Sequence, residues 1–226
     1  MTRADTKTTR GRGRPRDPGT DVAILKAALE LFADRGIDAT SLEGIARRAG
    51  VARLTLYRRW NSKEELIAQA IESALASIPR PAEDDARDGD PVSDLVERSI
   101  PASAAVLADP LFSGMVAQIL GSAVRYPLLM EIYWERYVLP RRRATAVLLD
   151  RAKAEGLLAA DADVDVLTDM MAGAVLYRAV RPGALDEAKA RAYLEAVYRE
   201  AGLLPREAGQ AGSSVRGDFG LSRGTS

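Results

Sequence analysis

The chain has 226 residues, of which 47% are hydrophobic and 28% are charged, a balance typical of one or two soluble globular domains. It contains no cysteine and no histidine, which excludes disulfides, thiolate metal sites and Ser-His or Cys-His catalytic pairs. We therefore expect no metal site and no cofactor. Because paired-carboxylate and phosphate-loop motifs are also missing, we do not expect an enzyme.

The formal net charge of zero hides a difference between the two parts of the chain. Residues 1–80 carry 15 Lys and Arg against 10 Asp and Glu, whereas residues 81–226 carry 17 against 22. A basic N-terminal third indicates contact with a polyanion. No run of about 18 apolar residues and no signal peptide is found, so we expect a cytoplasmic protein without a membrane partner.

Residues 1–20 are polar and lack periodicity, which predicts a disordered basic arm. Within this arm Gly13-Arg14-Pro15, flanked by Arg12 and Arg16, has the pattern of an AT-hook core. Arginines in such a segment can enter a narrow A·T minor groove. The alternative is a flexible tail that attracts DNA without sequence preference, and both interpretations stay open.

Four helices are predicted between residues 21 and 78. The first covers about 21–35 and ends at Gly36, and the second follows Thr40, whose spacing to Glu43 is that of a capping box. Gly50 ends the second helix, and the third is "VARLTLYRRW", residues 51–60. The fourth begins at Ser62, with Glu65 three residues later, and runs to about residue 77.

The second and third of these helices predict a helix-turn-helix, because a tight glycine turn joins them and the third is rich in arginine. Between Ser41 and Trp60 there are five arginines and one acid, Glu43, to which we assign a capping role. Leu56 and Trp60 lie four residues apart and share a buried face. The remaining side chains of the third helix are then free to meet a major groove, where phosphates would neutralise their charge.

The rest of the chain also has helical periodicity. Residues 79–91 form an acidic loop rich in Pro and Gly, and residues 205–226 form a disordered tail. Between them we predict helices near 92–107, 110–124, 127–155 with a bend or break at Pro140, 162–180 and 184–202. Because strand patterns are nearly absent, the predicted fold class is all-α.

The segment "TSLEGIARRAGVARLTLYRRWNSKEEL" resembles the DNA-binding domain of the TetR/AcrR family of transcriptional regulators. The resemblance implies a three-helix helix-turn-helix domain over residues 21–78 and a helical ligand-binding and dimerisation domain over residues 92–204. It also implies a sequence-specific DNA-binding regulator, a repressor that a small molecule releases from a palindromic operator. A regulator without an inducer, or an activator, is the alternative, and an enzyme in the C-terminal domain is less favoured.

By this resemblance the base-reading residues are Arg53, Leu54 and Thr55, and the phosphate contacts are Ser41, Tyr57, Arg59 and Lys63. Two alternatives stay open: Tyr57 could serve in packing, and Leu54 could be a structural residue. The sequence departs from the family at Ala52, where a hydroxyl residue usually caps the recognition helix. It also departs at Leu54, where a small residue or proline is common, and at Trp60, which replaces phenylalanine.

For the C-terminal part, the resemblance implies a homodimer through the last two helices, which form a four-helix bundle with those of the partner. The apolar residues available for this contact are Leu167, Met170, Met171, Ala174 and Val175 in one helix, and Tyr193, Leu194, Val197, Tyr198 and Ala201 in the other. Packing within one chain is the alternative for each residue.

A ligand pocket is expected among the middle helices, because flexible sulfur and aromatic side chains gather there. Its candidate residues are Met115, Ile119, Met130, Tyr133, Trp134, Tyr137 and Tyr177. Ordinary core packing is the alternative for this set. Residues 141–143, three arginines in a row, could bind an acidic ligand, although a solvated face is the favoured interpretation.

Overall fold

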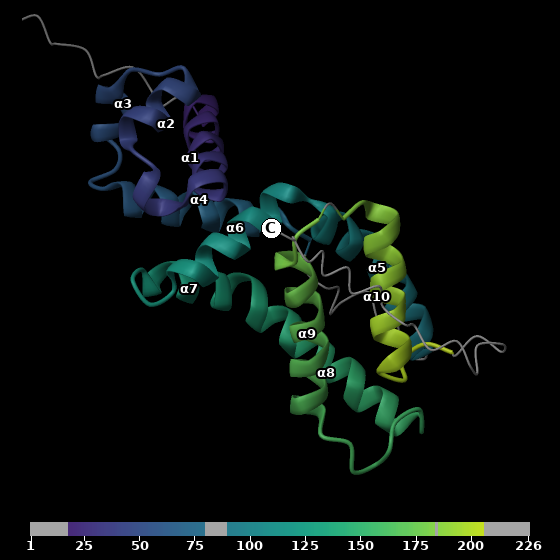
Figure 1. The fold of residues 1–226 in the computed structure, drawn as a ribbon. Coiled ribbons are helices and arrows are strands. Elements are labelled where there is room, and N and C mark those ends of the chain that lie inside the picture. The colour runs from purple at the N-terminus through teal and green to yellow at the C-terminus, as the bar shows by residue number, and fades with distance from the viewer. Residues whose placement is uncertain (1–17, 80–89, 184, 206–226) are drawn as a thin grey trace, which may run out of the picture.

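The computed structural model describes residues 18–79, 90–183 and 185–205, and these residues form helices without any strand. The predicted all-α class is therefore confirmed. The predictions for Arg12, Arg14 and Arg16, for most of the acidic loop and for nearly all of the tail lie outside the described residues. Figure 1 shows an elongated molecule with α1 to α4 at one end and α8 to α10 toward the other.

The N-terminal end consists of α1 (Pro18–Ala39), α2 (Leu42–Ala49), α3 (Arg53–Tyr57) and α4 (Lys63–Ser77). Gly36 has φ 76° and ψ 174°, so regular helix stops there as predicted, and a short turn continues to Ala39. Such a conformation is open almost only to glycine. A Cβ at this position would also lie 2.7 Å from Oε1 of Gln118, which would have to move aside, so the backbone conformation is what requires glycine.

The predicted capping box at Thr40 and Glu43 is wrong by one residue. Thr40 is buried and its hydroxyl donates to the Gly36 carbonyl at 2.7 Å, while the Ser41 hydroxyl accepts from the Gly44 N–H at 3.1 Å. Ser41 is therefore the N-cap of α2. Because an inward-facing threonine can close the preceding turn, the cap passes to the next hydroxyl in the chain.

The predicted cap of α4 at Ser62 is confirmed, but the return contact from Glu65 reaches a different residue. The Ser62 hydroxyl accepts from the Glu65 N–H at 3.0 Å. The Glu65 carboxylate in turn accepts from the backbone N–H of Asn61 at 2.9 Å, one residue before the cap. These bonds satisfy N–H groups that a helix start leaves without partners.

The C-terminal part begins with α5 (Val92–Ala108), α6 (Pro110–Ser122) and α7 (Pro127–Tyr133). A π-helical turn, η1 (Trp134–Val138), then leads into α8 (Leu139–Ala154). The predicted break at Pro140 takes the form of this turn, in which the Leu139 N–H reaches back to the Trp134 carbonyl. The wider turn comes directly before a proline, whose ring and missing N–H disturb a regular helix.

The last two helices are α9 (Val164–Val180) and α10 (Glu187–Glu200). Several apolar residues predicted for a dimer contact also pack within one chain. Leu194 is buried, and Leu167, Met171, Val175, Tyr193 and Tyr198 pack around the same core. Met170 is an exception, with 64% of its surface exposed. These residues thus take part in packing within the chain, which the sequence left open, and the predicted dimer contact stays a prediction.

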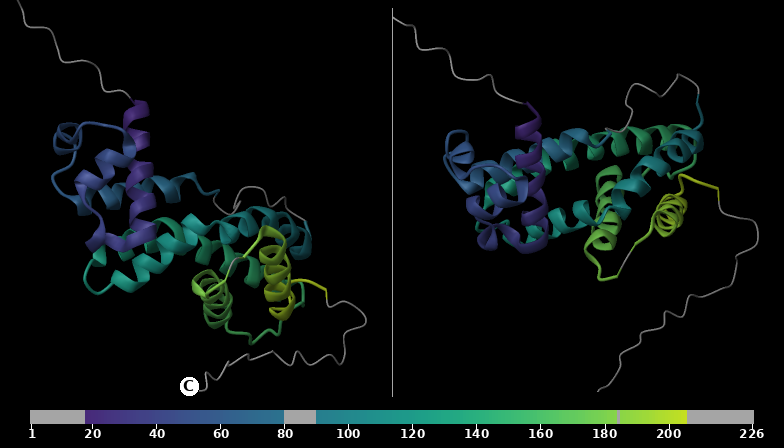
Figure 2. Two further views of the ribbon diagram at one scale, coloured as in Figure 1. Left: turned by 45° about the horizontal axis from the view of Figure 1, so that its top comes forward. Right: turned by 90° about the horizontal axis from the view of Figure 1, so that it is seen from above.

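The buried residues form two cores. One joins α1 to α4 with α6 and α7, and the other joins α5, α8 and α10, against which α9 packs. Figure 2 shows α6 lying along the N-terminal helices. The backbones come close where a Cβ on Gly114 of α6 would lie 3.1 Å from the Ala33 carbonyl oxygen of α1. The first core therefore contains residues from both sides of the acidic segment in the sequence.

Among the described residues, no single helix has the length and hydropathy needed to cross a membrane. Helices α5 and α6 pass such a test only together, as a pair bent by 71°.

Candidate nucleic-acid interface

The turn between α2 and α3 has the geometry of a helix-turn-helix. Gly50 ends α2 in the left-handed conformation with φ 68°, and the Val51 N–H donates to the Ala46 carbonyl at 3.0 Å. Ala52 begins α3 in extended conformation and provides no side-chain cap, as the sequence predicted. The three residues between the helices, Gly50 to Ala52, thus set the direction of α3.

Helix α3 and the residues after it have one buried and one exposed side. Leu56 is fully buried and Trp60 is 5% exposed, and the Trp60 Nε1–H donates to Oε1 of Gln69 on α4 at 2.6 Å. Leu54 and Tyr57 are 61% and 51% exposed, which is unusual for large apolar side chains. Buried Leu56 and Trp60 and exposed Leu54 agree with the predicted inward and outward faces, while contact with DNA stays a prediction. The exposed apolar side chains are suited to thymine methyl groups and sugar edges.

Glu43 does not cap α2, contrary to the prediction. Its carboxylate turns toward α3, where Oε1 accepts from the Tyr57 hydroxyl at 2.9 Å and forms an ion pair with Arg53 Nη2. Its own backbone N–H and then the Tyr57 hydroxyl hold the pKa of Glu43 below the usual value. The pKa of Arg53 is raised, and the main reason is the hydrogen bond between the side chains of Arg53 and Tyr57. Two predicted DNA contacts therefore share one carboxylate.

Other arginines of this surface are paired with α1. Arg59, a predicted phosphate contact, forms an ion pair with Asp21 and is only 18% exposed. Arg48 pairs with Glu30 at 2.6 Å. Arg47 and Arg58 are exposed. Arg59 thus fixes the end of α3 to α1, and any phosphate contact that it makes competes with Asp21.

Lys63 and Ser41 lie at helix ends. The Lys63 ammonium donates to the carbonyls of Ile37 at 2.8 Å and Asp38 at 3.4 Å, which lie at the end of α1. A cation is favoured there, because the last carbonyls of a helix lack partners. Ser41 is exposed and caps α2, and Thr55 is partly buried on α3. The role of these three residues in DNA contact stays a prediction.

A polar junction connects the same helix end to the C-terminal part. The Asp38 carboxylate pairs with Arg125 at 2.8 Å and accepts from the Tyr126 hydroxyl at 2.7 Å. This hydrogen bond is the main cause that raises the pKa of Tyr126. The loop between α6 and α7 is therefore held within a few ångströms of Lys63 and the start of α4.

The candidate ligand-binding residues are only partly together. Met115, Ile119 and Tyr133 are buried in the first core, and Met130 and Tyr137 pack against it. The Tyr133 and Tyr137 rings stack with centroids 5.5 Å apart. Trp134 is 41% exposed and Tyr177 is 66% exposed, so their rings face solvent in the single chain.

Arg141 differs most from expectation. Its guanidinium lies 3.8 Å above the Tyr137 ring and donates to the Pro79 carbonyl at 2.8 Å, so a solvated face is wrong for this residue. Burial lowers its pKa. Within the described residues no carboxylate pairs with it, whereas the neighbouring Arg142 pairs with Asp165 and Asp169. The spacing of four residues between Tyr137 and Arg141 was the available sequence signal.

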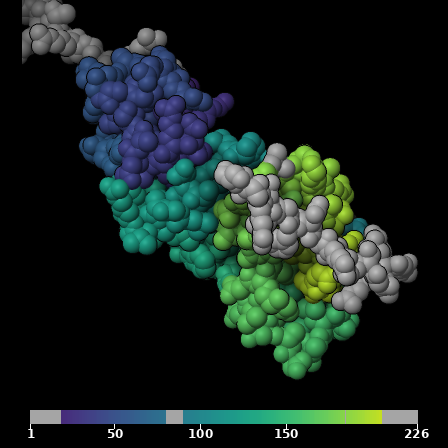
Figure 3. Space-filling model, in the orientation of Figure 1, coloured from purple at the N-terminus to yellow at the C-terminus, as the bar shows by residue number. Residues whose placement is uncertain are grey.

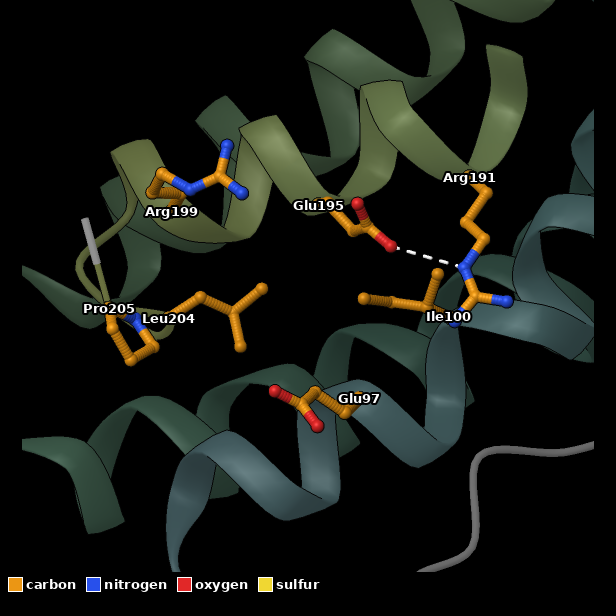
Figure 4. Close-up of a pocket in the computed structure, with 7 residues that line it drawn as sticks. All are labelled: Glu97, Ile100, Arg191, Glu195, Arg199, Leu204 and Pro205. Carbon is orange, nitrogen blue, oxygen red and sulfur yellow. Dashed lines mark hydrogen bonds and ion pairs between the residues drawn. The ribbon is translucent and has the colours of Figure 1, made fainter. Parts of the chain in front are cut away.

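The described part of the C-terminal region has hollows on its surface. One of about 410 Å³ lies between α5 and α10 (Figure 4), lined by Glu97, Ile100, Arg191, Glu195, Arg199, Leu204 and Pro205. Another, of about 300 Å³, is lined by Ala123, Pro127, Met130, Glu131, Trp134 and Glu135. Only Met130 and Trp134 of the predicted pocket residues border either hollow. The described residues hold no group of three or more acids that could bind a metal ion.

Comparison with protein families gives two matches along the chain. Residues 24–70 match the model of bacterial regulatory proteins of the tetR family, and residues 86–197 match a tetracyclin repressor-like C-terminal domain. The HTH-type transcriptional regulator YdeS of Bacillus subtilis is 31% identical over 173 residues, which cover 76% of this chain and 84% of YdeS. The regulator Rv1556 of Mycobacterium tuberculosis is 24% identical over 75% of this chain and 82% of its own length.

Solved structures show the same fold at lower identity. FadR of Bacillus subtilis, solved with stearoyl-CoA, gives a TM-score of 0.62 at 19% identity and covers 78% of this chain and 96% of its own. A regulator from Saccharomonospora viridis, solved with choline, gives 0.65 at 16% identity over 81% and 97%. The helix-turn-helix and the C-terminal helices are thus both present in one known arrangement.

Proposed function

The chain belongs to the tetR family of bacterial regulatory proteins and is a DNA-binding regulator of transcription, and we propose that it acts as a dimeric repressor released from a palindromic operator by a small-molecule ligand. The family consists of regulators and not of enzymes. The exposed side of α3 carries the proposal. Arg53, Leu54 and Tyr57 face solvent there while Leu56 and Trp60 anchor the segment, as a helix that enters a major groove requires.

An exposed stripe along α9 supports the dimer. Val166, Met170, Tyr177 and Val180 are 52%, 64%, 66% and 41% exposed, and Gly173 lies between them. Their spacing of four, three, four and three residues is that of an interface between two packed helices. A two-fold dimer through α9, with α10 beside it, would hold two copies of α3 against successive major grooves of one duplex.

The shared first core supports regulation by a ligand. Since α6 and α7 pack on α1 and α4, a ligand that displaces them would also move α3. The coupling is reciprocal, so DNA must weaken ligand binding by the same factor. The structures solved with stearoyl-CoA and choline indicate that this fold accepts chemically different ligands. For this chain, the partly buried Arg141 beside Tyr137 favours a ligand with an acidic group.

The test starts from selection of duplexes out of a random pool by the full chain. We expect a palindromic sequence with half-sites one helical turn or a multiple apart, and weaker binding when a ligand found by thermal-shift screening is added. A pool that shows no enriched sequence would contradict the DNA-reading role. Enrichment with no ligand effect would instead leave a regulator without an inducer, and stimulated transcription from the selected site would indicate an activator.

A further inference from the structure

One carboxylate stands within the basic surface of α2 and α3. Glu43 is the only acid between Ser41 and Trp60. An acid in the first turn of a helix is favourable for that helix in any case. However, the Glu43 carboxylate reaches across to α3 and contacts both Arg53 and Tyr57. Its position is therefore set by the recognition helix as much as by its own helix.

The contact lies at the surface and leaves Arg53 able to bind further groups. The side chains of Glu43 and Arg53 are 44% and 62% exposed, so both face the space that DNA would enter. The ion pair engages Arg53 through Nη2, and a guanidinium carries five N–H donors in all. The pair thus presents a fixed donor edge next to a fixed acceptor edge.

A G·C base pair offers the matching pattern in the major groove. Guanine presents two acceptors, N7 and O6, and cytosine presents the N4–H donor beside them. Arginine is the usual partner of the guanine acceptors, and a carboxylate accepts from cytosine N4. A guanidinium and a carboxylate held side by side are complementary to this order of groups. Phosphate, by contrast, would be repelled by the carboxylate.

We propose that Glu43 is a specificity-determining residue that acts together with Arg53 as one unit to bind a single G·C pair in each half-site. The proposal rests on the proposed function, because it presumes that α3 enters the major groove. Glu43 holds the Arg53 guanidinium in place before DNA arrives, so less side-chain freedom is lost on binding. It also weakens binding to sequences that do not place a donor opposite the carboxylate.

The experiment uses the full chain and the duplex that the wild-type chain selects from a random pool. Each base pair of the half-site is replaced in turn by the other three, and affinities are measured for the wild type and for Glu43→Gln. We expect Glu43→Gln to lose about tenfold or more of the discrimination at one G·C position. Its affinity for unrelated DNA should rise, since a negative charge near the phosphates is removed.

Two further variants separate base reading from a purely structural contact. Arg53→Gln should lose discrimination at the same position, and the double variant should lose little more than either single one. Glu30→Gln serves as the matched control. Like Glu43, Glu30 pairs with an arginine of the helix-turn-helix, in its case Arg48 of α2. This control should keep the wild-type profile.

Two results overturn the proposal. Glu43→Gln could keep wild-type discrimination at every position, or it could lower all affinities in proportion together with the melting temperature, as loss of a structural contact would. Both differ from failure of the proposed function, in which the wild-type chain itself enriches no sequence.

Discussion

Lys63 has one observed contact and one predicted contact, and a single experiment can separate them. The sequence assigns it to phosphate through its family resemblance, and the structure places its ammonium on two carbonyls at the end of α1. An ammonium has three donors, so the two roles are compatible. If Lys63 binds phosphate as predicted, part of the electrostatic attraction to DNA lies where the first helix ends.

We expect Lys63→Met to affect both stability and DNA affinity. The free energy of unfolding should fall by about 1–2 kcal/mol, since hydrogen bonds from a charged donor are lost. Binding to all duplexes should weaken, with a salt slope lower by about one. Urea unfolding and titrations at several salt concentrations measure the two effects. Lys26→Met, which removes an exposed lysine of α1, is the control and should leave both stability and the slope nearly unchanged.

Buried tyrosines predict a loss of stability at alkaline pH. Burial raises the pKa of Tyr133, Tyr137 and Tyr198 above the usual value of about 10. As the pH rises, the unfolded chain therefore releases these protons first. The contribution of these tyrosines to the free energy of unfolding is fully present below pH 10 and decreases as the pH rises above it. Each tyrosine contributes at most about 1.4 kcal/mol per pH unit.

Urea unfolding between pH 8 and pH 11 measures this dependence. Tyr133→Phe should make the decline shallower, because one phenol no longer titrates. Tyr177→Phe, at an exposed ring, is the control. An equal decline for Tyr133→Phe and the wild type would contradict the assignment of the effect to this residue.

At the scale of elements, α3 is unusual in being short and uncapped. A helix of five residues is not stable by itself in water, so its stability comes from Leu56, Trp60 and the ion pair of Arg59 with Asp21. Because all three anchors lie in its second half or just after it, the base-facing first turn depends on contacts made further along the chain.

Ala52→Ser should strengthen this helix. Ala52 already has the extended backbone of an N-cap, so a hydroxyl there can accept from the first free N–H groups. We expect a gain of about 0.5–1.5 kcal/mol in unfolding free energy, measured with urea. Ser62→Ala, which removes an existing cap, should give a loss of similar size. No gain from Ala52→Ser would mean that α3 is already fixed by its anchors.

The sequence was sufficient for the elements and for the buried side of α3, but not for the contacts between helices. Hydrophobic spacing placed Leu56 and Trp60 inside, and Gly36 and Gly50 marked the helix ends correctly. The pairing of Glu43 with Arg53 was missed, because it spans ten residues and depends on how two helices cross. The pattern of residues within one helix does not show the angle at which it crosses another helix.

At the scale of the whole molecule, the last two helices were harder to interpret. Helix α9 is apolar on two sides, so periodicity could not tell whether Met170 or Met171 faces the core. The space-filling view in Figure 3 shows the same elongated form as the ribbon, with α8 and α9 at the end away from α1 to α4. In the proposed dimer, a second chain would cover the outer side of α9. The hydrophobic pattern of a single chain does not show where that second chain lies.

Met170→Glu should disrupt the dimer. A charge in the middle of the exposed α9 stripe would have to be buried without a partner, so we expect a monomer by size exclusion with light scattering. Operator affinity should fall by about tenfold or more, because one half-site alone must then hold the chain. Val124→Glu, at a fully exposed apolar residue in the turn after α6, is the control and should remain dimeric. A monomeric wild type would contradict the α9 interface.

The continuous first core limits how parts of this regulator can be exchanged with another. A chimaera that joins α1 to α4 to a foreign C-terminal part would leave the apolar surface that meets Met115, Val116 and Ile119 uncovered or badly matched. Exposed surface of that kind leads to aggregation. The smallest portable unit runs from α1 through α7. If α3 and Glu43 read the operator as proposed, such a hybrid could be given a new operator by replacing Glu43 and the outer side chains of α3, because these are not part of this core.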